Sequence, residues 1–210
     1  TYCDPADVMA AIAHEDGAVL LDSQQAGGDN GRCAVIPVGA RTRLRTYGDR
    51  TRIEDTGGFT TWHTGDPFHL LKQELAWWRL RLCCDDDGTK QAPYVFTGGA
   101  LGLFGYDLAR RLEDIGRDDK PRAIPDMDVR IYQGALVFDQ QAQQADLYCH
   151  AVDKGEADAL YAQVTAQLAT AGPPSAAPIA LDWRADEDRA SYRAKIARVI
   201  EAIYAGDIFQ

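Results

Sequence analysis

The sequence predicts an α+β fold in which mainly antiparallel sheets form layers with helices packed outside. Apolar and polar residues alternate over several short runs separated by glycine-rich or polar turns, which is typical of antiparallel strands. Longer segments repeat apolar residues at helical spacing. The regular strand–helix–strand alternation of a parallel sheet is missing, so strands and helices are expected to form separate layers.

Composition and charge limit the classes of partner. The chain has 210 residues, of which 46% are hydrophobic, and its formal net charge is -10. A nucleic-acid partner needs a basic face, and no cluster of five or more Lys and Arg residues is present, so we expect no nucleic acid. No apolar run approaches the about 20 residues of a membrane helix, and no export signal is visible. We therefore expect a cytoplasmic protein with small-molecule or protein partners and no membrane contact.

Cysteines, histidines and acidic runs predict no metal site in this chain. The five cysteines are odd in number and irregularly spaced, so they are interpreted as free thiols in a reducing compartment. The four histidines are scattered rather than set at the offsets of zinc ligands. The acidic run at 85–87 is a solvated loop by composition, although its carboxylates are of the kind that bind metals.

The first third of the chain predicts one helix followed by strands. A helix is expected over 5–13 and a buried strand over 17–23, ending in two polar residues. Separate strands are predicted over 33–36 and 41–47, the second with alternating polar and apolar positions. The segment 57–64 is expected to be a loop or an edge strand.

A helix is predicted to begin at Asp66 and Pro67, because Asp caps helices well and Pro suits the first helical position. Its core-facing stripe consists of apolar residues at helical spacing, namely Phe68, Leu71, Leu75, Trp78 and Leu82. Adjacent aromatic residues on a helix point in different directions, so Trp77 and Trp78 indicate packing with partial exposure.

The most distinctive stretch is the glycine-rich run at 98–113. Its helical pattern opens only at Tyr106 and Asp107, after the glycines, so the run lacks the helix start that a phosphate cradle needs. The glycines are interpreted as positions where another part of the fold approaches the backbone closely.

The last part of the chain predicts a hairpin and two helices. The hairpin comprises strands at 129–139 and 145–151, and a helix with Leu160, Val164 and Leu168 on one face follows over 154–170. A second helix is capped by Asp186 or Asp188, ends near Gly206, and has a predicted buried face of Tyr192, Ile196, Val199 and Ile203. Residues 208–210 are predicted to begin a strand.

Three stretches resemble component I of the chorismate-aminating synthases. The run Gly-Gly-Ala-Leu-Gly-Leu-Phe-Gly-Tyr-Asp-Leu-Ala-Arg-Arg at 98–111, followed by Pro-Asp-Met at 125–127, resembles the middle of these proteins. Leu-Leu-Asp-Ser at 20–23, followed by Arg32, resembles their amino-terminal tryptophan-site signature. Residues 192–210 resemble the helix and strand that open their chorismate-binding domain. Together, in this order, the stretches cover nearly the whole chain.

Within this family the sequence resembles aminodeoxychorismate synthase more than anthranilate synthase. Leu103 stands where anthranilate synthases tend to carry tyrosine, and the lead before the Leu-Leu-Asp-Ser signature is short. The run Ile-Tyr-Gln-Gly-Ala-Leu-Val at 131–137 favours the same member. Gly-Asp-Ile-Phe-Gln at 206–210 is closer to the anthranilate form, so anthranilate synthase component I is the alternative.

The resemblance implies an anthranilate synthase component I-like layered sandwich. It divides the chain into an amino-terminal α/β region over 1–171, a linker over 172–180 and the incomplete start of the catalytic domain over 181–210. The full protein would use Mg²⁺, held beyond this chain, and ammonia from a glutamine amidotransferase subunit to convert chorismate into 4-amino-4-deoxychorismate for p-aminobenzoate and folate. A divalent ion suits this chemistry because it polarises the leaving oxygen. The chain alone, truncated before the catalytic half, is expected to be inactive.

Gln210 is the candidate catalytic residue, at a position that selects the nucleophile. The resemblance extends to isochorismate synthases, which have a lysine at the matching position. That lysine can act as a base on water. A glutamine cannot take that proton, which fits ammonia as nucleophile. The alternative interpretation is a polar residue in a strand.

The resemblance also implies an effector site like the tryptophan pocket of the family. Carried over residue by residue, its lining on this half is Ser23, Asn30, Gly31, Arg32 and Cys33. Asn30 and Cys33 depart from the aromatic residues often found there, so the site is predicted to be weakened or vestigial.

The same residues also have purely structural interpretations: Ser23 caps a turn, and Arg32 forms an ion pair with Asp22 or Asp29. A non-catalytic regulatory module that binds an amino acid here is the alternative from another functional class. Docking of the amidotransferase subunit is a further role that can coexist with the enzyme.

Overall fold

The computed structural model describes residues 2–23, 31–79, 95–113, 116, 123–172 and 182–210. It divides into two compact units, Thr1–Pro174 and Ser175–Gln210, which we treat separately. The predicted linker over 172–180 lies outside the described residues except for Gly172. The division at 171 and 181 therefore stays a prediction.

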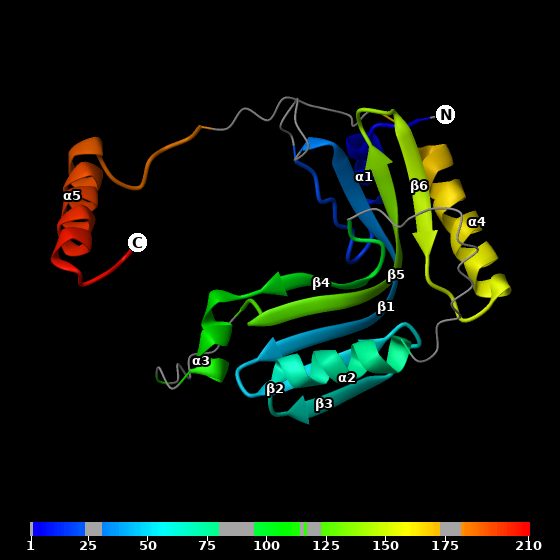
Figure 1. Ribbon diagram of the computed structural model, residues 1–210, viewed down its shortest axis with the longest axis horizontal. Helices are drawn as coiled ribbons and strands as arrows, with labels where there is room; N and C mark the ends of the chain where they lie inside the picture. The colour runs from blue at the N-terminus through cyan, green and yellow to red at the C-terminus, as the bar shows by residue number, and fades with distance from the viewer. Residues whose placement is uncertain (1, 24–30, 80–94, 114–115, 117–122, 173–181) are drawn as a thin grey trace. The chain divides into compact units, whose positions relative to one another are not determined.

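The first unit is built on one antiparallel sheet of six strands, in the order β3-β2-β1-β5-β4 with β6 also paired to β5. The strands are β1 (Cys33–Tyr47), β2 (Arg50–Asp55), β3 (Thr60–Thr64), β4 (Gly99–Phe104), β5 (Met127–Asp139) and β6 (Gln144–Cys149). Strands β1 and β5 pair from Cys33 with Asp139 to Thr46 with Met127, so they form the spine of the sheet (Figure 1). The predicted antiparallel sheet with outer helices is confirmed.

Short polar residues set the starts of the helices. The helices are α1 (Pro5–Ile12), α2 (Pro67–Arg79), α3 (Ala109–Leu112), α4 (Lys154–Thr170) and, in the second unit, α5 (Arg189–Ala205), with a 3₁₀ turn η2 (Tyr106–Leu108) before α3. The Asp4 carboxylate accepts from the Ala6 N–H at 2.8 Å and that of Asp66 from the Phe68 N–H at 2.9 Å. Both caps satisfy helix-start donors, which confirms the predicted helix starts.

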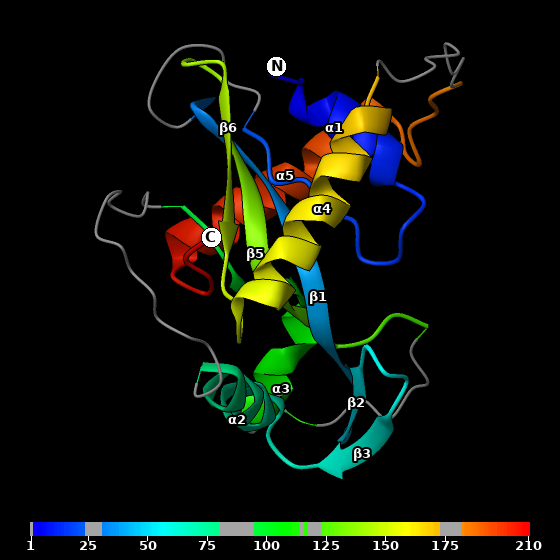
Figure 2. The same cartoon turned by 90° about the vertical axis from the view of Figure 1, so that its right-hand side faces the viewer.

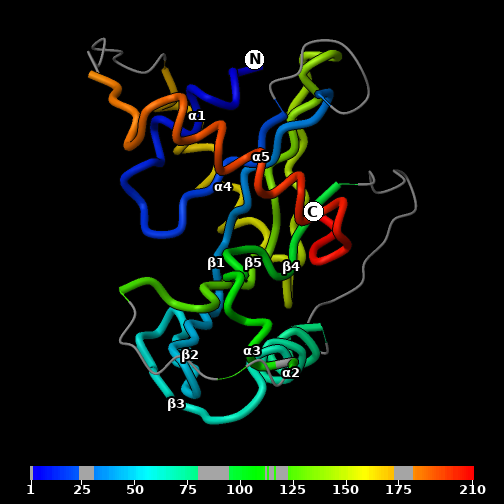
Figure 3. Tube along the Cα trace, turned by 90° about the vertical axis from the view of Figure 1, so that its left-hand side faces the viewer, coloured from blue at the N-terminus to red at the C-terminus, as the bar shows by residue number. Residues whose placement is uncertain are grey.

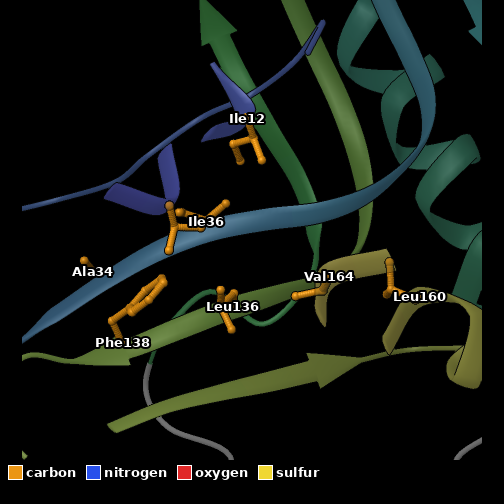
Figure 4. Close-up of a cluster of buried hydrophobic side chains, with 8 residues drawn as sticks. Ile12, Ala34, Ile36, Leu136, Phe138, Leu160 and Val164 are labelled. Carbon is orange, nitrogen blue, oxygen red and sulfur yellow. The ribbon is translucent and has the colours of Figure 1, made fainter. Parts of the chain in front are cut away.

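Two hydrophobic clusters lie at opposite ends of the β1–β5 pair. The cluster against α1 and α4 contains Val8, Ile12, Ala34, Ile36, Leu136, Phe138, Leu160 and Val164 (Figure 4). The cluster against α2 contains Leu44, Leu71, Leu108, Met127, Val129 and Ile131. Successive side chains of a strand point to opposite faces, so Leu136 and Val129 of β5 face opposite ways. Helices α1 and α4 thus cover one face at one end of the sheet, and α2 covers the other face at the other end (Figure 2).

A β-bulge in β1 separates these two ends. The pairing with β5 shifts between Ala40 and Thr42, so Arg41 is the extra residue. Its guanidinium lies 5.7 Å from the ring centroid of Trp78 on α2. The same group donates to Gln133 on β5 at 2.6 Å and to the Glu156 carboxylate on α4. Arg41 therefore contacts the helices of both faces.

The structure corrects three strand predictions. The strands expected over 33–36 and 41–47 are one strand, because the bulge and Gly39, at a φ of +65°, let the chain continue past Pro37. Residues 17–23 form only an isolated bridge, with Leu21 exchanging two 2.9 Å hydrogen bonds with Val35. Residues 208–210 are not a strand, since no described strand pairs with them.

Strand β4 explains the glycine-rich run. It lies along β5 with Gly102 opposite Val129 (Figure 3). A Cβ added to Gly102 would meet the Asp128 carbonyl oxygen at 2.1 Å, and one added to Gly105 would meet that of Asp126 at 2.7 Å. These glycines are therefore close-packing positions, as the sequence predicts.

The second unit contains α5. The Asp188 carboxylate caps it by accepting from Ala190 and Ser191, and Gly206 ends it in the left-handed conformation, as predicted. The predicted buried face is wrong for this structure: Tyr192, Ile196, Val199 and Ile203 are all exposed, and no residue of α5 is buried. Residues 182–210 contain no second helix or strand on which α5 could pack.

Candidate effector site

The predicted effector residues lie where β1 begins. The Leu21–Val35 bridge places the end of the Leu-Leu-Asp-Ser segment beside β1, so Ser23 and Cys33 belong to the same edge of the sheet. Ser23 is exposed, whereas Gly31 and Cys33 are half-buried. Asn30 lies outside the described residues. The structure thus brings together four of the five predicted residues in the chain segments that flank this end of β1.

Arg32 is held by a carboxylate that comes from a distant part of the sequence. Its Nε and Nη2 atoms donate to Oδ2 of Asp139 at 2.8 and 2.6 Å. The sequence suggested Asp22 or Asp29 as the partner of Arg32. Asp29 lies outside the described residues. The side chain of Asp22 accepts a hydrogen bond from Nε2 of Gln140 at 3.0 Å. The ion pair with Asp139 was missed.

Asp139 is fixed by the turn between β5 and β6. Its Oδ1 accepts from the backbone N–H groups of Gln141 at 3.1 Å and Ala142 at 2.9 Å. The hydrogen bonds from Arg32 and then that from Ala142 hold the pKa of the Asp139 carboxyl below its usual range. Because both oxygens are engaged, this ion pair is better ordered than a typical surface pair.

The turn between β5 and β6 also contacts the segments 21–23 and 31–33. The backbone N–H of Gln140 donates to the Arg32 carbonyl at 2.9 Å, while its side chain reaches Asp22. Residues 21–23, 31–33 and 139–142 therefore form one connected group. We call this group, with Tyr2 and Asp4 beside it, the hairpin-tip site.

Three carboxylates of the hairpin-tip site act on the hydroxyl of Tyr2. Burial raises the pKa of the Tyr2 hydroxyl, and the charges of Asp4, Asp139 and Asp22 raise it further. The Tyr2 ring packs edge-on against Phe138, with 6.2 Å between the ring centroids. This contact keeps the Tyr2 hydroxyl near these carboxylates. Such a site can bind an ammonium group through its carboxylates and a hydroxyl or carbonyl group through Ser23 and Arg32.

Gln210 lies in the other unit and is exposed. It follows the Gly206 cap by a few residues, and Phe209 before it is also exposed. Its nucleophile-selecting role stays a prediction.

Neither a metal-binding cluster nor a membrane-spanning helix is found among the described residues. In the described segments, no three His, Cys, Asp or Glu side chains are close enough to hold a metal ion. In the same segments, no helix is long and apolar enough to cross a membrane.

Comparison with known proteins identifies the family. The family described as chorismate binding enzyme matches residues 17–210. The chain is 32% identical over 204 residues to aminodeoxychorismate synthase component 1 of Klebsiella aerogenes and 34% identical over 206 residues to that of Salmonella typhimurium, covering 96% of this chain and 42% of each relative. It is 26% identical over 225 residues to anthranilate synthase component 1 of Pseudomonas putida, covering 98% of this chain and 44% of that protein.

A solved structure supports the fold. Anthranilate synthase component I from Streptococcus pneumoniae superposes with a TM-score of 0.54 at 18% identity, covering 89% of this chain and 42% of that one. This confirms the predicted α+β architecture. The chain spans less than half the length of these relatives. The match across residues 17–210 shows that the chain belongs to the family of chorismate binding enzymes.

Proposed function

We propose that this chain is the amino-terminal part of an aminodeoxychorismate synthase component I, which aminates chorismate to 4-amino-4-deoxychorismate. The proposal rests on sequence identity. The chain is 32% and 34% identical to two relatives named for this activity but 26% identical to an anthranilate synthase, each over at least 96% of the chain. Leu103, on the exposed part of β4, is the residue that distinguishes the two signatures.

The chemistry would be shared with groups outside the described residues. Ammonia would come from a glutamine amidotransferase subunit, and Mg²⁺ would assist loss of the chorismate hydroxyl. The described residues do not fit a Mg²⁺ site, because carboxylates do not converge on one point as its octahedral shell requires. No step is therefore assigned to a metal on this chain. The cytoplasmic location and the linker over 172–180 are part of the same proposal.

The test of the activity is a product assay. The full-length protein is incubated with chorismate, Mg²⁺ and an ammonium salt, and the product is identified after treatment with the lyase that converts 4-amino-4-deoxychorismate to 4-aminobenzoate. We expect 4-aminobenzoate; anthranilate formed without the lyase would instead assign the protein to anthranilate synthase. The 210-residue chain alone should give neither product.

We propose that Gln210 favours ammonia as the nucleophile because its side-chain amide cannot act as a base that deprotonates water. An amide does not accept a proton near neutral pH, whereas a lysine with a lowered pKa does. In the full-length protein, Gln210→Lys should produce hydroxylated product from chorismate, with Gln210→Glu and Gln210→Met as variants that separate basicity from side-chain size. If Gln210→Lys forms only aminated product, this role of Gln210 is wrong.

The hairpin-tip site is proposed to be an amino-acid effector site with Ser23, Asn30, Gly31, Arg32 and Cys33 in its lining. Its support is the connected group of segments around Arg32 and the carboxylates of Asp4, Asp22 and Asp139, a kind of group that can bind an ammonium group. Calorimetric titration with L-tryptophan tests it. Weak or absent binding is expected; micromolar binding would contradict a weakened site.

A further inference from the structure

The sheet face opposite α2 carries two adjacent rows rich in arginine. Residues directly opposite each other in paired strands share a face, so the registers of β1 to β5 define which side chains lie together. One row across these strands is Trp62, Arg52, Arg45, Asp128 and Leu103. The row beside it is Thr60, Glu54, Arg43, Arg130 and Leu101. Leu44 and Val129, which pack under α2, alternate with these residues and point the other way. We call the two rows, with Arg50, the arginine face.

Positive charge is in excess where β2 crosses the arginine face. Arg45 and Arg52 lie directly opposite each other, an arrangement of like charges that destabilises a sheet. Glu54 bridges them, because it pairs with Arg45 and, at 2.6 Å, with Arg52. Arg50 is exposed, and its guanidinium lies 4.8 Å from the ring centroid of Trp62. Within the face, three guanidinium groups thus accompany one carboxylate on these two strands, in a chain whose formal net charge is -10.

The half of the face on β5 is balanced in charge and rigid. Arg43 donates to both carboxylate oxygens of Asp128, at 2.8 and 2.6 Å. Asp16, in the loop after α1, pairs with Arg43 at 3.1 Å and with Arg130 at 2.6 Å. These ion pairs fix the side chains before any partner binds, which lowers the entropic cost of binding.

Exposed apolar side chains stand at both ends of the first row. Trp62 is 48% exposed at one end, and Leu103 is 50% exposed at the other. Strands β1 to β5, all of which the structure describes, contain no lysine, so each positive charge of the face is an arginine. Tryptophan and arginine are enriched, and lysine is depleted, where proteins bind each other. Solvation of the sheet explains the ion pairs, but it does not explain Trp62 and Leu103, whose exposure to water is unfavourable.

We propose that the arginine face is the docking surface for a protein with an acidic contact patch, namely the glutamine amidotransferase subunit of the proposed function. The inference rests on that function only for the identity of the partner. Neighbouring strands lie about 4.8 Å apart, so a row across these strands is about 19 Å wide, which suits a protein contact rather than a small-ligand pocket. Carboxylates of the partner pair with Arg50 and Arg52, and an apolar side chain of the partner covers Trp62.

Trp62→Ala and Arg50→Glu test the two kinds of contact. Trp62→Ala removes the apolar anchor, and affinity for the subunit should fall about thirtyfold, the effect of losing one binding hot spot. Arg50→Glu reverses an exposed charge, so it should mainly slow association and weaken the dependence of the association rate on salt. The matched controls are Tyr161→Ala and Lys154→Glu on α4, at exposed positions outside the arginine face.

The experiment measures binding of the purified amidotransferase subunit to the full-length protein by surface plasmon resonance at low and high salt. Chorismate amination is assayed on the same preparations, with either glutamine or an ammonium salt as the nitrogen source. Amination driven by ammonium needs no docked partner, so both variants should keep the wild-type rate. Amination driven by glutamine, at subunit concentrations below saturation, should fall in step with affinity. Both controls should match the wild type in every measurement.

Equal affinity of the subunit for the wild type, Trp62→Ala and Arg50→Glu would overturn the proposal. So would a wild type that does not bind the subunit, or one that self-associates through Trp62, which would assign the face to a second copy of the chain. Loss of ammonium-driven amination in Trp62→Ala alone would indicate a folding defect, and Arg50→Glu then decides. If the wild type aminates chorismate with neither nitrogen source, the reaction proposal fails, while the affinities still decide the docking proposal.

Discussion

Replacing Gly102 by alanine should open the sheet between β4 and β5. The new Cβ would lie 2.1 Å from the Asp128 carbonyl oxygen and 2.7 Å from the Cα of Val129. Both are backbone atoms of a central strand, so neither can rotate away as a flexible side chain would. Relief requires β4 to move outward by about 1 Å, which lengthens its hydrogen bonds to β5 beyond the normal range.

The magnitude follows from the length of the β4–β5 ladder. Its register runs from Gly99 opposite Tyr132 to Phe104 opposite Met127. If roughly three ladder hydrogen bonds are lost at about 1 kcal/mol each, the free energy of unfolding should fall by about 3 kcal/mol. The matched control is Gly172→Ala, since nothing lies within 4 Å of a Cβ at Gly172.

The assay is urea unfolding of the full-length protein, followed by tryptophan fluorescence. A lower midpoint at an unchanged slope is expected for Gly102→Ala, and no shift for Gly172→Ala. If Gly102→Ala lies within about 0.5 kcal/mol of the wild type, the range of ordinary surface substitutions, then the close approach of β4 to β5 is not a constraint.

Further expectations concern the core, the link to α2 and the hairpin tip. Phe138→Ala, at a fully buried position, should lower the free energy of unfolding by about 3–5 kcal/mol in the same urea assay. Trp78→Phe should cost about 1–2 kcal/mol, because the indole N–H donates to buried Thr42 at 3.1 Å and its ring lies beside a guanidinium. The depressed pKa of Asp139 stabilises the fold above its unfolded-state value near 3.8, and this contribution is lost as the pH falls through the lower folded-state pKa. Asp139→Asn should therefore flatten the acid limb of the stability profile, measured as thermal midpoint against pH.

Each of these expectations has a control on an exposed position. Tyr161→Phe on α4, where the ring is exposed, should not move the urea midpoint, unlike Phe138→Ala and Trp78→Phe. Asp158→Asn should keep the acid limb of the wild type. An acid limb that is the same in Asp139→Asn and the wild type would show that the ion pair with Arg32 contributes nothing to stability.

Local signals were sufficient for the helices and the hairpin. Helix α4 was predicted from Leu160, Val164 and Leu168 at one-turn spacing, and the structure adds a cap at Asp153, whose side chain accepts from the Glu156 N–H. The β5–β6 hairpin follows from two apolar runs joined by a polar turn. Such features depend on neighbours in sequence, which is why they are visible without a structure.

Features that depend on distant pairing were not predicted. The continuity of β1 past Pro37 requires its pairing with β5, which the sequence does not reveal. The partner of Arg32 is separated from it by 107 positions, and only the register of Cys33 with Asp139 brings the two together. For α5 the apolar periodicity predicted the helix itself, but its face of Tyr192, Ile196, Val199 and Ile203 is exposed, so the predicted burial was wrong.

The bulge at Arg41 lets one side chain connect the two ends of the first unit. A side chain in a regular strand points to one face of the sheet only. Because Arg41 is the extra residue of the bulge, it is not paired in the β1–β5 ladder, and its side chain contacts both α2 and α4. Deleting Arg41 would leave every other strand pair in register and yet remove this tie through the sheet. The contacts of this one side chain with Trp78 on α2 and Glu156 on α4 would then be lost.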